Sequence, residues 1–337
     1  MKGDIADNPM NSGTSKSRYR RQKFTIPNRL NIALTVLVIS LSVWCLYYTA
    51  NTDSVVGKIS AAILFSFIMQ TGFSLLHEAE HNKLHRSQRV NDILGFLLAT
   101  LFPASYRLLK EAHLNHHKMN RSDAELVDYY TSSDNRTVKT ILYYSLISGL
   151  IWMAAPVMTL LVALLPSRLV DQKSDRKHAS ATDKYMPFIQ RAGARNVTRE
   201  TVTVLIIWIF LWNALHLDWL SLSLCYAAFA FSWSSQQYIY HVRTPRHLIE
   251  GAYDLSLFAP LQWLYLNFNF HLQHHRAVNV PWIYMHNMNT TPPERKYLST
   301  YLKLWCPPQS VEKAWPVEFQ RRGTLTPKST ESVISEY

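Results

Sequence analysis

Cysteine is scarce in this chain of 337 residues. Its three cysteines, Cys45, Cys225 and Cys306, lie far apart and form no CxxC pair. The sequence therefore predicts neither a disulfide framework nor a cysteine-based zinc site. It also lacks a cytochrome-like haem motif and the cysteine pattern of iron–sulfur proteins. Cysteine chemistry is thus excluded as the basis of function.

Acidic residues are few relative to basic ones. The chain has 23 Asp and Glu against 35 Lys and Arg, which gives a formal charge of +12. The basic residues gather in the N-terminal arm and in residues 168–199, where they flank apolar stretches instead of alternating with aromatic residues. This pattern disfavours nucleic-acid binding. It is typical of the cytoplasmic loops of membrane proteins and of contacts with anionic headgroups.

Neither end of the chain contains a long apolar run. Residues 1–28 are polar and basic with no apolar core, which excludes a signal peptide and predicts a disordered cytoplasmic arm. Residues 291–337 are polar and contain prolines, so we expect a peripheral C-terminal tail. Residues 29–290 between them form the predicted membrane domain.

Long apolar stretches are present, although the mean hydropathy of −0.09 hides them. Residues 30–50 and 55–76 each reach the roughly 20 residues that cross a bilayer as a helix, and the short link predicts a hairpin. Further apolar stretches cover 140–166 and 201–236. Residues 91–110 are also apolar, but Pro103 interrupts them, which favours an interfacial or half-buried helix.

These stretches predict an all-α fold, a multi-pass transmembrane helical bundle with a histidine-rich cap on the cytoplasmic side. If the basic residues 167–199 are cytoplasmic like the N-terminal arm, the stretches 140–166 and 201–236 must each enter and return, the first near Gly149 and Pro156. In the competing topology each stretch is one long helix and the basic loop is translocated. Both versions keep residues 77–117 and 241–275 on one side.

Histidine is abundant, with 14 residues, and most of them are clustered. The clusters are HEAEH at 77–81, HLNHH at 113–117, QYIYH at 237–241 and HLQHH at 271–275. Residues three and four apart share one face of a helix, so each cluster can direct two or three imidazoles to one point. Two H-x-x-H-H boxes on helices indicate metal ligation.

The number of histidines predicts two metals. HEAEH alone has the form of the zinc-protease motif H-E-x-x-H. A catalytic zinc, however, uses three protein ligands, and nine candidates are too many for one such site. Imidazole ligands without thiolates suit iron best, and the ligand types alone leave zinc and manganese open. The nine candidate metal ligands are His77, His81, His113, His116, His117, His241, His271, His274 and His275.

The order and spacing of the boxes resemble the membrane fatty acid desaturase family, the histidine-box desaturase/hydroxylase superfamily. Its pattern is H-x(3–4)-H, then H-x(2–3)-H-H, then H/Q-x(2–3)-H-H, separated by transmembrane helices. Here HEAEH, HLNHH and HLQHH meet it across residues 55–290. The stretches NRSDAELVD (120–128) and LNFNFHLQHHRAVNVPW (266–282) also look similar to the family.

The resemblance implies a di-iron oxidoreductase that uses O2 as co-substrate and acts on lipid acyl chains. Its electrons then come from a separate ferredoxin, rubredoxin or cytochrome b5 type of donor. The segment QYIYH stands where the family places a further cofactor ligand, which makes Gln237 and His241 candidates. His85 lies outside the pattern. The implied catalytic residues are His77, His81, His113, His116, His117, His271, His274 and His275.

Residues around the boxes are candidates for supporting roles. Carboxylates should hold the ring nitrogens that do not bind metal, although each one alone is also typical of a solvated surface acid; they are Glu78, Glu80, Asp123, Glu125, Asp128 and Asp254. Aromatic residues suit either an interfacial belt or an acyl channel; they are Tyr238, Tyr240, Trp263, Tyr265, Phe268, Phe270 and Trp282. Basic residues suit an anionic head group, an acidic electron donor or ordinary cytoplasmic anchoring; they are Arg107, Lys110, Lys118 and Arg121.

Four functions remain open at this stage. A desaturase is favoured because the sequence around the second and third boxes looks closer to that branch. A hydroxylase or ketolase acting on alkane, carotenoid or sphingoid chains would use the same boxes. A membrane zinc protease using HEAEH and a non-enzymatic metal-handling protein belong to other classes.

Overall fold

The structure is a computed structural model that describes residues 24–122, 125–165, 186–288 and 292–311. Most of the predicted N-terminal arm, most of the C-terminal tail and Asp123 lie outside these residues. Most of the described residues are helical, and a two-residue parallel ladder pairs β1 (Tyr129–Tyr130) with β2 (Gln309–Ser310). The predicted all-α class is confirmed. The helices are α2 (Asn28–Asn51), α3 (Val55–Glu80), α4 (Gln88–Leu101), α5 (Tyr106–Met119), α6 (Arg136–Ser145), η1 (Leu146–Leu150), α7 (Ile151–Leu164), α9 (Met186–Ala192), α10 (Ala194–Ala214), α11 (Trp219–Ile239), α12 (Ala259–Leu264), α13 (His271–Arg276), η3 (Trp282–Asn287) and α14 (Tyr297–Leu304).

Among the described residues, four helices are long and apolar enough to cross a membrane. They are α2, α3, the joined segment Arg136–Leu164 and α10, and a fifth span results if the bent pair α4 and α5 counts as one. Large apolar side chains on these helices face outward, such as Val36, which is 57% exposed, and Ile209, which is 63% exposed. Proteins in water rarely expose such large apolar surfaces, whereas the tails of membrane lipids can cover them. The chain is therefore a multi-pass helical bundle, as predicted.

Helix α3 occupies the centre of the bundle and carries the first box at its end. Its start is capped by Ser54, whose hydroxyl accepts a hydrogen bond from the Gly57 N–H at 3.1 Å. Polar side chains then fix α3 to α11, since Gln70 donates to the Ser232 hydroxyl at 3.0 Å. Such hydrogen bonds pair polar groups that a lipid environment would leave unsatisfied.

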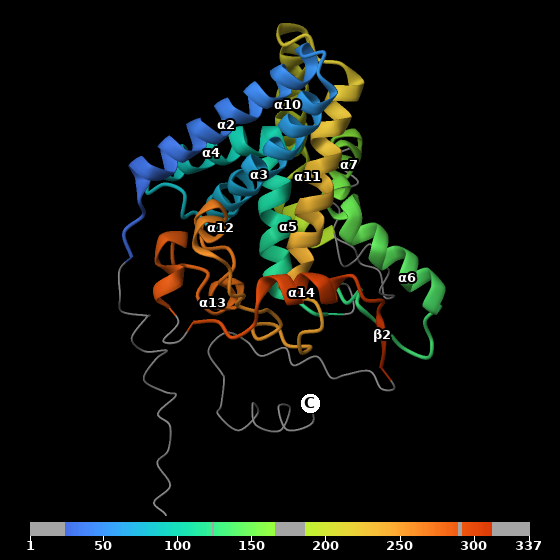
Figure 1. Cartoon of the computed structure of the whole chain (residues 1–337). Helices are drawn as coiled ribbons and strands as arrows, with labels where there is room; N and C mark the ends of the chain where they lie inside the picture. Colours follow the sequence, from blue (N-terminus) through green and yellow to red (C-terminus); the bar gives the residue numbers. More distant parts are fainter. Residues whose placement is uncertain (1–23, 123–124, 166–185, 289–291, 312–337) are drawn as a thin grey trace, which may run out of the picture.

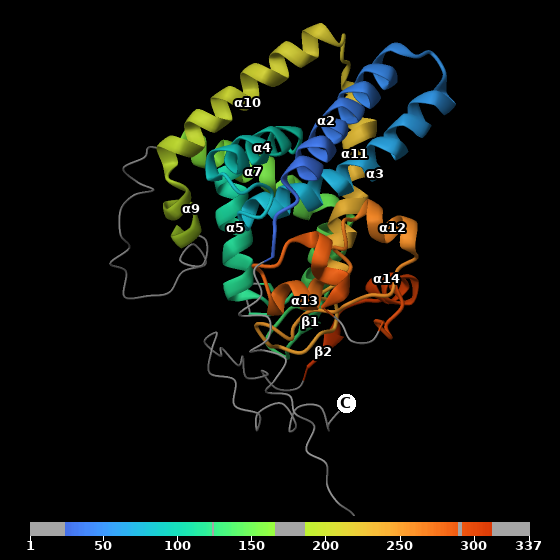
Figure 2. The same ribbon diagram turned by 90° about the vertical axis from the view of Figure 1, so that its left-hand side faces the viewer.

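Of the two versions predicted for the stretch 201–236, the structure has two helices and not one long helix. Helix α10 ends at Ala214 and α11 begins at Trp219, where Asp218 caps it by accepting from the Ser221 N–H at 2.9 Å. Figure 2 shows α10 slanting away from the other helices before the chain turns back into α11. The polar residues His216 and Asp218, which interrupt the apolar stretch 201–236 in the sequence, thus lie at the turn between the two helices.

The segment 136–164 bends at Gly149. This residue has a φ of +146°, a backbone conformation that residues with a side chain rarely adopt. A Cβ built there would lie 3.5 Å from the Ala230 Cβ, so the bend also packs closely against α11. Pro156 lies inside α7 beyond the bend. The bend separates the directions of α6 and α7 (Figure 1).

Residues 91–110 do not form one helix, because α4 and α5 meet at a 95° bend. The four residues between them contain Pro103, which lacks the backbone N–H that a continuing helix needs. Ser105 then caps α5 by accepting from the Leu108 N–H at 3.3 Å. The bend turns α5, and the second box that it carries, toward the end of α3.

The C-terminal elements α12, α13, η3 and α14 gather at one end of the helices (Figure 1). Trp282 ties this cap to the bundle. Its indole N–H donates to Asn31 Oδ1 at 3.0 Å, and its backbone N–H donates to Glu78 at 3.1 Å. Earlier on α3, Thr71 and Ser74 donate to the backbone carbonyls of Leu264 and Tyr265, which precede the third box. These contacts hold α13 against the end of α3 that carries the first box.

Candidate metal centre

The histidine boxes come from four parts of the chain that meet at one end of the bundle. His77 lies in the last turn of α3, and His81 is the residue that ends this helix. His113, His116 and His117 lie on α5, and His271, His274 and His275 lie on the short helix α13. His241 follows α11 by two residues.

The nine predicted ligands fall into two groups, each with its ring nitrogens within 4.8 Å of one another. The five-histidine group contains His77, His81, His113, His117 and His274, and the four-histidine group contains His116, His241, His271 and His275. Each group combines histidines from distant boxes. The two H-x-x-H-H boxes contribute to both groups and lie on the same side of the bundle, as the account from sequence requires.

In the five-histidine group the Nε2 atoms face one another at short range. The Nε2 atom of His113 lies 2.8 Å from that of His81 and 3.0 Å from that of His117. The Nε2 atom of His274 lies 3.1 Å from that of His117. The rings therefore direct the same nitrogen, Nε2, to one shared point.

The four-histidine group has the same arrangement. The Nε2 atom of His271 lies 3.0 Å from that of His241 and 3.2 Å from that of His275. His116 completes the group, with its ring centroid 4.9 Å from that of His241. The two groups adjoin each other, because the rings of His117 and His275 have centroids only 4.5 Å apart. A pair of metals held here would be close neighbours.

Burial keeps the histidines of the cap neutral. The loss of water and the repulsion by neighbouring histidines hold the pKa of His271, His274 and His275 well below its ordinary value. The pKa of His241 is lowered in the same way, chiefly by burial and by His116. Neutral imidazole is the form that binds metal ions.

The tautomers also suit a metal. The Nδ1 atom of His241 lies 2.8 Å from the Gly251 carbonyl, which can only accept, so Nδ1 carries the proton and Nε2 presents a lone pair. His77 Nε2 is buried and has no hydrogen-bond partner. Closely spaced nitrogen lone pairs repel one another unless a cation lies among them. The donor set therefore fits two metal ions, one in each group.

The candidate carboxylates differ in what they contact. Glu125 lies 2.7 Å from His116 Nδ1, so it can hold that ring nitrogen. Glu80 lies 3.9 Å from His113 Nδ1, within ion-pair range but beyond a hydrogen bond. Two other candidates have different partners, since Glu78 accepts from the Trp282 N–H and Asp128 accepts from Arg121. Asp254 accepts from the backbone and side chain of Gln273 in the third box.

Two residues near the boxes stay outside both groups. His85 lies beyond α3, where its Nδ1 accepts from the Ser87 N–H at 2.9 Å. Gln237 is half-buried in the last turn of α11, one turn before His241. Its role as a cofactor ligand stays a prediction.

The basic residues do not form one surface for an anionic partner. Arg121 is only 1% exposed and forms an ion pair with Asp128 at 2.8 Å, so it is wrong as a headgroup contact. Lys110 donates to Asn82 at 2.6 Å, and Arg107 lies 3.5 Å from Glu200. Lys118 on α5 is exposed.

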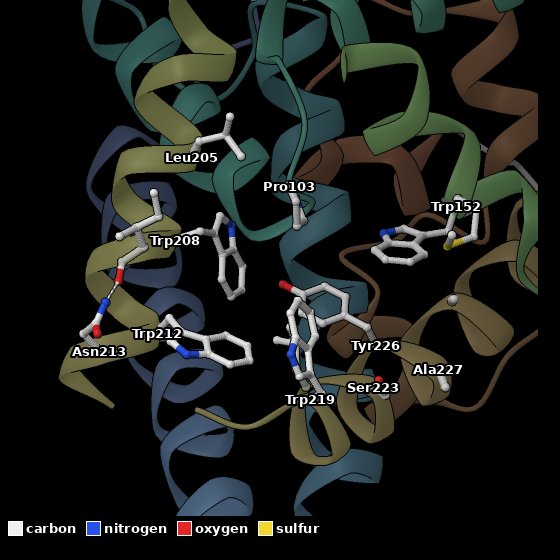
Figure 3. A pocket seen from close by; sticks show the side chains of 14 residues that line it. Pro103, Trp152, Leu205, Trp208, Trp212, Asn213, Trp219, Ser223, Tyr226 and Ala227 are labelled. Carbon is white, nitrogen blue, oxygen red and sulfur yellow. Dashed lines mark hydrogen bonds between the residues drawn. The ribbon is translucent and has the colours of Figure 1, made fainter. Parts of the chain in front are cut away.

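Two cavities lie near or beyond the centre. Phe268 and Trp282, two of the predicted channel residues, line a cavity of about 10 Å³ beside His77 and His274. A cavity of about 750 Å³ lies between α7, α10 and α11, and Figure 3 shows Trp208, Trp212, Trp219 and Trp152 around it. None of the predicted channel aromatics lines this larger cavity.

The larger cavity is separated from the histidines by packed aromatic rings. Its lining residue Trp152 contacts Phe229, and Phe229 contacts Trp233. Trp233 packs edge-on against Phe73 at 5.1 Å between centroids, and Phe73 contacts the His77 ring at 6.1 Å. A series of contacting aromatic rings thus lies between the larger cavity and His77.

Residues that support the centre through backbone groups were not identified from the sequence. The Asn120 amide donates to the Gly251 carbonyl, which in turn holds His241. The Thr244 hydroxyl lies 2.8 Å from the His241 carbonyl and 3.1 Å from the Gly251 carbonyl. A backbone carbonyl cannot be recognised from residue types, and only the stretch 120–128, which follows the second box, pointed to this region.

Residues 53–290 match the family model described as Fatty acid desaturase. The matched region includes all nine clustered histidines and covers more than half of the chain.

Proposed function

The chain belongs to the fatty acid desaturase family, and from that premise we propose that it is a di-iron membrane enzyme that uses O2 to introduce a double bond into a lipid acyl chain. The family implies an oxidoreductase of the fatty acid desaturase/hydroxylase kind with a lipid substrate.

The observation that carries the proposal is the convergence of nine imidazoles into two adjoining groups. A zinc protease needs one metal and three protein ligands, so a second group of four histidines has no purpose in it. A pair of metals with nitrogen ligands and no thiolate is suited to O2 chemistry. Removing hydrogen from an unactivated methylene needs an oxidant that no side chain provides, and two irons with O2 supply it.

The protein's own residues would hold the metals and fix their ligands. Helices α3, α5 and α13 set the spacing of eight of the nine histidines, including His81 at the end of α3. Glu125 accepts a hydrogen bond from His116 Nδ1–H, which leaves the Nε2 lone pair free to bind metal and makes the ring a stronger ligand. The ligands for the two irons are proposed to be the five-histidine and four-histidine groups.

Aromatic residues would keep water away from the reaction. The ring of Phe268 lies 5.0 Å from that of His77, between centroids, and Phe73 lies behind the same histidine. A dry, apolar surrounding suits an acyl methylene and protects reactive oxygen chemistry from side reactions. The acyl chain is proposed to reach the centre along this apolar side.

Electrons would enter from the opposite side. The side chains of His116 and Glu125 are 25% and 29% exposed, whereas the other three members of the four-histidine group are buried. We infer that a ferredoxin, rubredoxin or cytochrome b5 type of donor approaches this partly exposed edge. The basic N-terminal arm and residues 168–199 support a cytoplasmic position for the cap and the N-terminus.

Expression in a host of known lipid composition tests the proposal. Mass spectrometry of the host's fatty acids should reveal new double bonds that are absent from cells expressing a His274→Ala variant. New hydroxyl or keto groups on acyl, alkane, carotenoid or sphingoid chains would instead identify a hydroxylase or ketolase. An unchanged lipid profile, with the protein present in membranes and a donor supplied, would contradict both activities.

A further inference from the structure

The position of His241 depends on a backbone carbonyl. The other three members of the four-histidine group lie on helices, but His241 lies in a turn beyond α11. Its Nδ1 donates to the Gly251 carbonyl at 2.8 Å, and its Nε2 faces that of His271 at 3.0 Å. Whatever holds Gly251 in place therefore orients His241 as well.

Two further side chains hold the loop around the Gly251 carbonyl. The Asn120 side-chain amide donates to this carbonyl at 3.2 Å. The Thr244 hydroxyl lies 2.8 Å from the His241 carbonyl and 3.1 Å from the Gly251 carbonyl, so its one proton faces both. Asn120 also donates to the Leu248 carbonyl at 3.1 Å. Asn120 follows the second box, so these bonds connect the end of α5 to the loop that orients His241.

Gly251 itself lies against the stem of a buried arginine. A Cβ at this position would come within 2.5 Å of Arg121 Cγ and 2.3 Å of the His247 carbonyl oxygen. No side chain therefore fits between the loop and Arg121. The contact lets the Gly251 backbone approach the turn after α5.

Arg121 and Asp128 form an ion pair that fixes the same loop at its other end. Both residues are 1% exposed, and Arg121 Nη1 donates to Asp128 Oδ1 at 2.8 Å. Arg121 Nη2 donates to the Thr244 carbonyl at 2.9 Å. Asp128 accepts from the Tyr238 hydroxyl at 2.7 Å and from the Arg243 N–H. The pair thus holds residues on both sides of His241.

We propose that Arg121, Asp128 and Thr244 are positioning residues that make the four-histidine group competent to bind metal, by fixing the turn that carries His241 and the Gly251 carbonyl that orients it. The inference rests on the proposed function, because it assumes that this group holds a metal. None of the three residues belongs to either histidine group. Their effect passes through Gly251 and the turn that carries His241.

The inference predicts an unequal effect on the two metal positions. The five-histidine group takes its ligands from α3, α5 and α13, and it contains neither His241 nor any residue of the 242–251 loop. Loosening the loop should therefore weaken metal binding at one position and spare the other. A role in general stability would instead affect both positions together.

Matched variants separate these cases. Thr244→Val removes the hydroxyl and keeps the shape, whereas Thr244→Ser keeps the hydroxyl. Asp128→Asn removes the charge that pairs with Arg121. Tyr143→Phe is the control, since the Tyr143 hydroxyl is equally buried in the neighbouring region but donates to the Leu304 carbonyl instead.

The measurement is iron content per chain of the full-length protein purified in detergent, with Mössbauer spectra to distinguish paired from isolated iron. We expect about two irons in the wild type, Thr244→Ser and Tyr143→Phe, and about one in Thr244→Val and Asp128→Asn, with loss of the paired signal. Two irons retained in Thr244→Val would overturn the inference. Equal loss of iron from both metal positions in this variant would overturn it as well.

The wild-type result separates the inference from the proposed function. A wild-type chain without paired iron contradicts the proposed function itself. A wild-type chain with paired iron that Thr244→Val leaves intact contradicts only the positioning role. If Asp128→Asn fails to reach the membrane, the Thr244→Val and Thr244→Ser pair still decides, because it changes a single hydroxyl.

Discussion

His117 and His274 are separated by 157 residues in the sequence, yet their Nε2 atoms lie 3.1 Å apart. His117 belongs to the second box on α5 and His274 to the third box on α13. Two neutral, buried imidazoles whose lone pairs face each other would gain little from this approach. A cation bound by both, as in the proposed metal centre, would account for it, and the predictions below follow from this relationship.

Removing one histidine from either group should abolish product formation. In His274→Ala the five-histidine group loses a nitrogen, and in His116→Ala the four-histidine group loses one. Both proteins should still insert in membranes, because the membrane-spanning helices are unchanged. Lipid mass spectrometry of expressing cells measures the product. His85→Ala is the matched control and should keep its activity, since His85 lies outside both groups. Product from either ligand variant would refute the site assignment.

Glu125 should tune the metal ligand His116 without binding metal. Its carboxylate lies 2.7 Å from His116 Nδ1. Loss of such a partner typically lowers metal affinity or activity about 10- to 100-fold, so Glu125→Ala should show a loss in this range. Glu125→Gln keeps an acceptor oxygen without the charge and should lose less. The comparison is made by product yield at equal protein level, and equal losses in the two variants would argue against a role for the hydrogen bond.

Gly251→Ala should destabilise the folded protein and disturb His241. The added methyl would lie 2.3 Å from the His247 carbonyl oxygen and 2.5 Å from Arg121 Cγ, closer than atoms approach without a shift of backbone. Overpacking of this kind costs about 1–3 kcal/mol. Thermal unfolding in detergent checks the result. Gly57→Ala should have a smaller effect, because the Tyr48 hydroxyl that it meets at 3.0 Å belongs to a side chain that can move. An unchanged unfolding temperature for Gly251→Ala would contradict the close approach.

The metal-free protein should lose stability in acid. The pKa values of His241, His271, His274 and His275 lie well below the ordinary value of about 6.5 that they regain in the unfolded chain. Below about pH 6.5 the unfolded chain therefore binds more protons than the folded one, so the free energy of unfolding falls as the pH decreases. Each histidine contributes up to about 1.4 kcal/mol per pH unit in that range and nothing above about pH 7.5.

Unfolding temperatures of chelator-treated protein between about pH 5 and pH 8 measure this effect. The decline should become shallower in a variant that carries both His271→Gln and His275→Gln, which removes two of the groups that titrate. Bound metal should reduce the decline until protons displace it, because metal and proton compete for the same nitrogen. An unfolding temperature that rises on acidification would contradict the buried, neutral state of these rings.

The histidine pattern was readable from the sequence because its geometry is local. His113, His116 and His117 share a helix face at any position in a fold, and an apolar run of about 20 residues predicts a membrane helix without knowledge of its neighbours. The family resemblance then indicated that the three boxes act together at one di-iron site. The distribution of the nine histidines into groups of five and four depends on how α3, α5 and α13 meet, which spacing alone does not determine.

The supporting contacts were less predictable because they depend on the tertiary structure. Arginine is usually found at the protein surface. Arg121 is instead buried in an ion pair with Asp128, and this depends on where Asp128 and the loop around Gly251 lie in the fold. Asp128 was a candidate for contact with a histidine ring, yet its bonds go to Arg121, Tyr238 and the backbone. Pro103 indicated an interruption of residues 91–110, but a proline does not specify the 95° bend that directs the second box to the first.

The number and pairing of bound irons test the central claim most directly. Full-length protein purified in detergent, with iron measured by elemental analysis and its magnetic state by Mössbauer spectroscopy, should contain about two irons per chain in one coupled pair. A single zinc, or irons that behave as isolated ions in the wild type, would contradict a di-iron centre built from the two histidine groups.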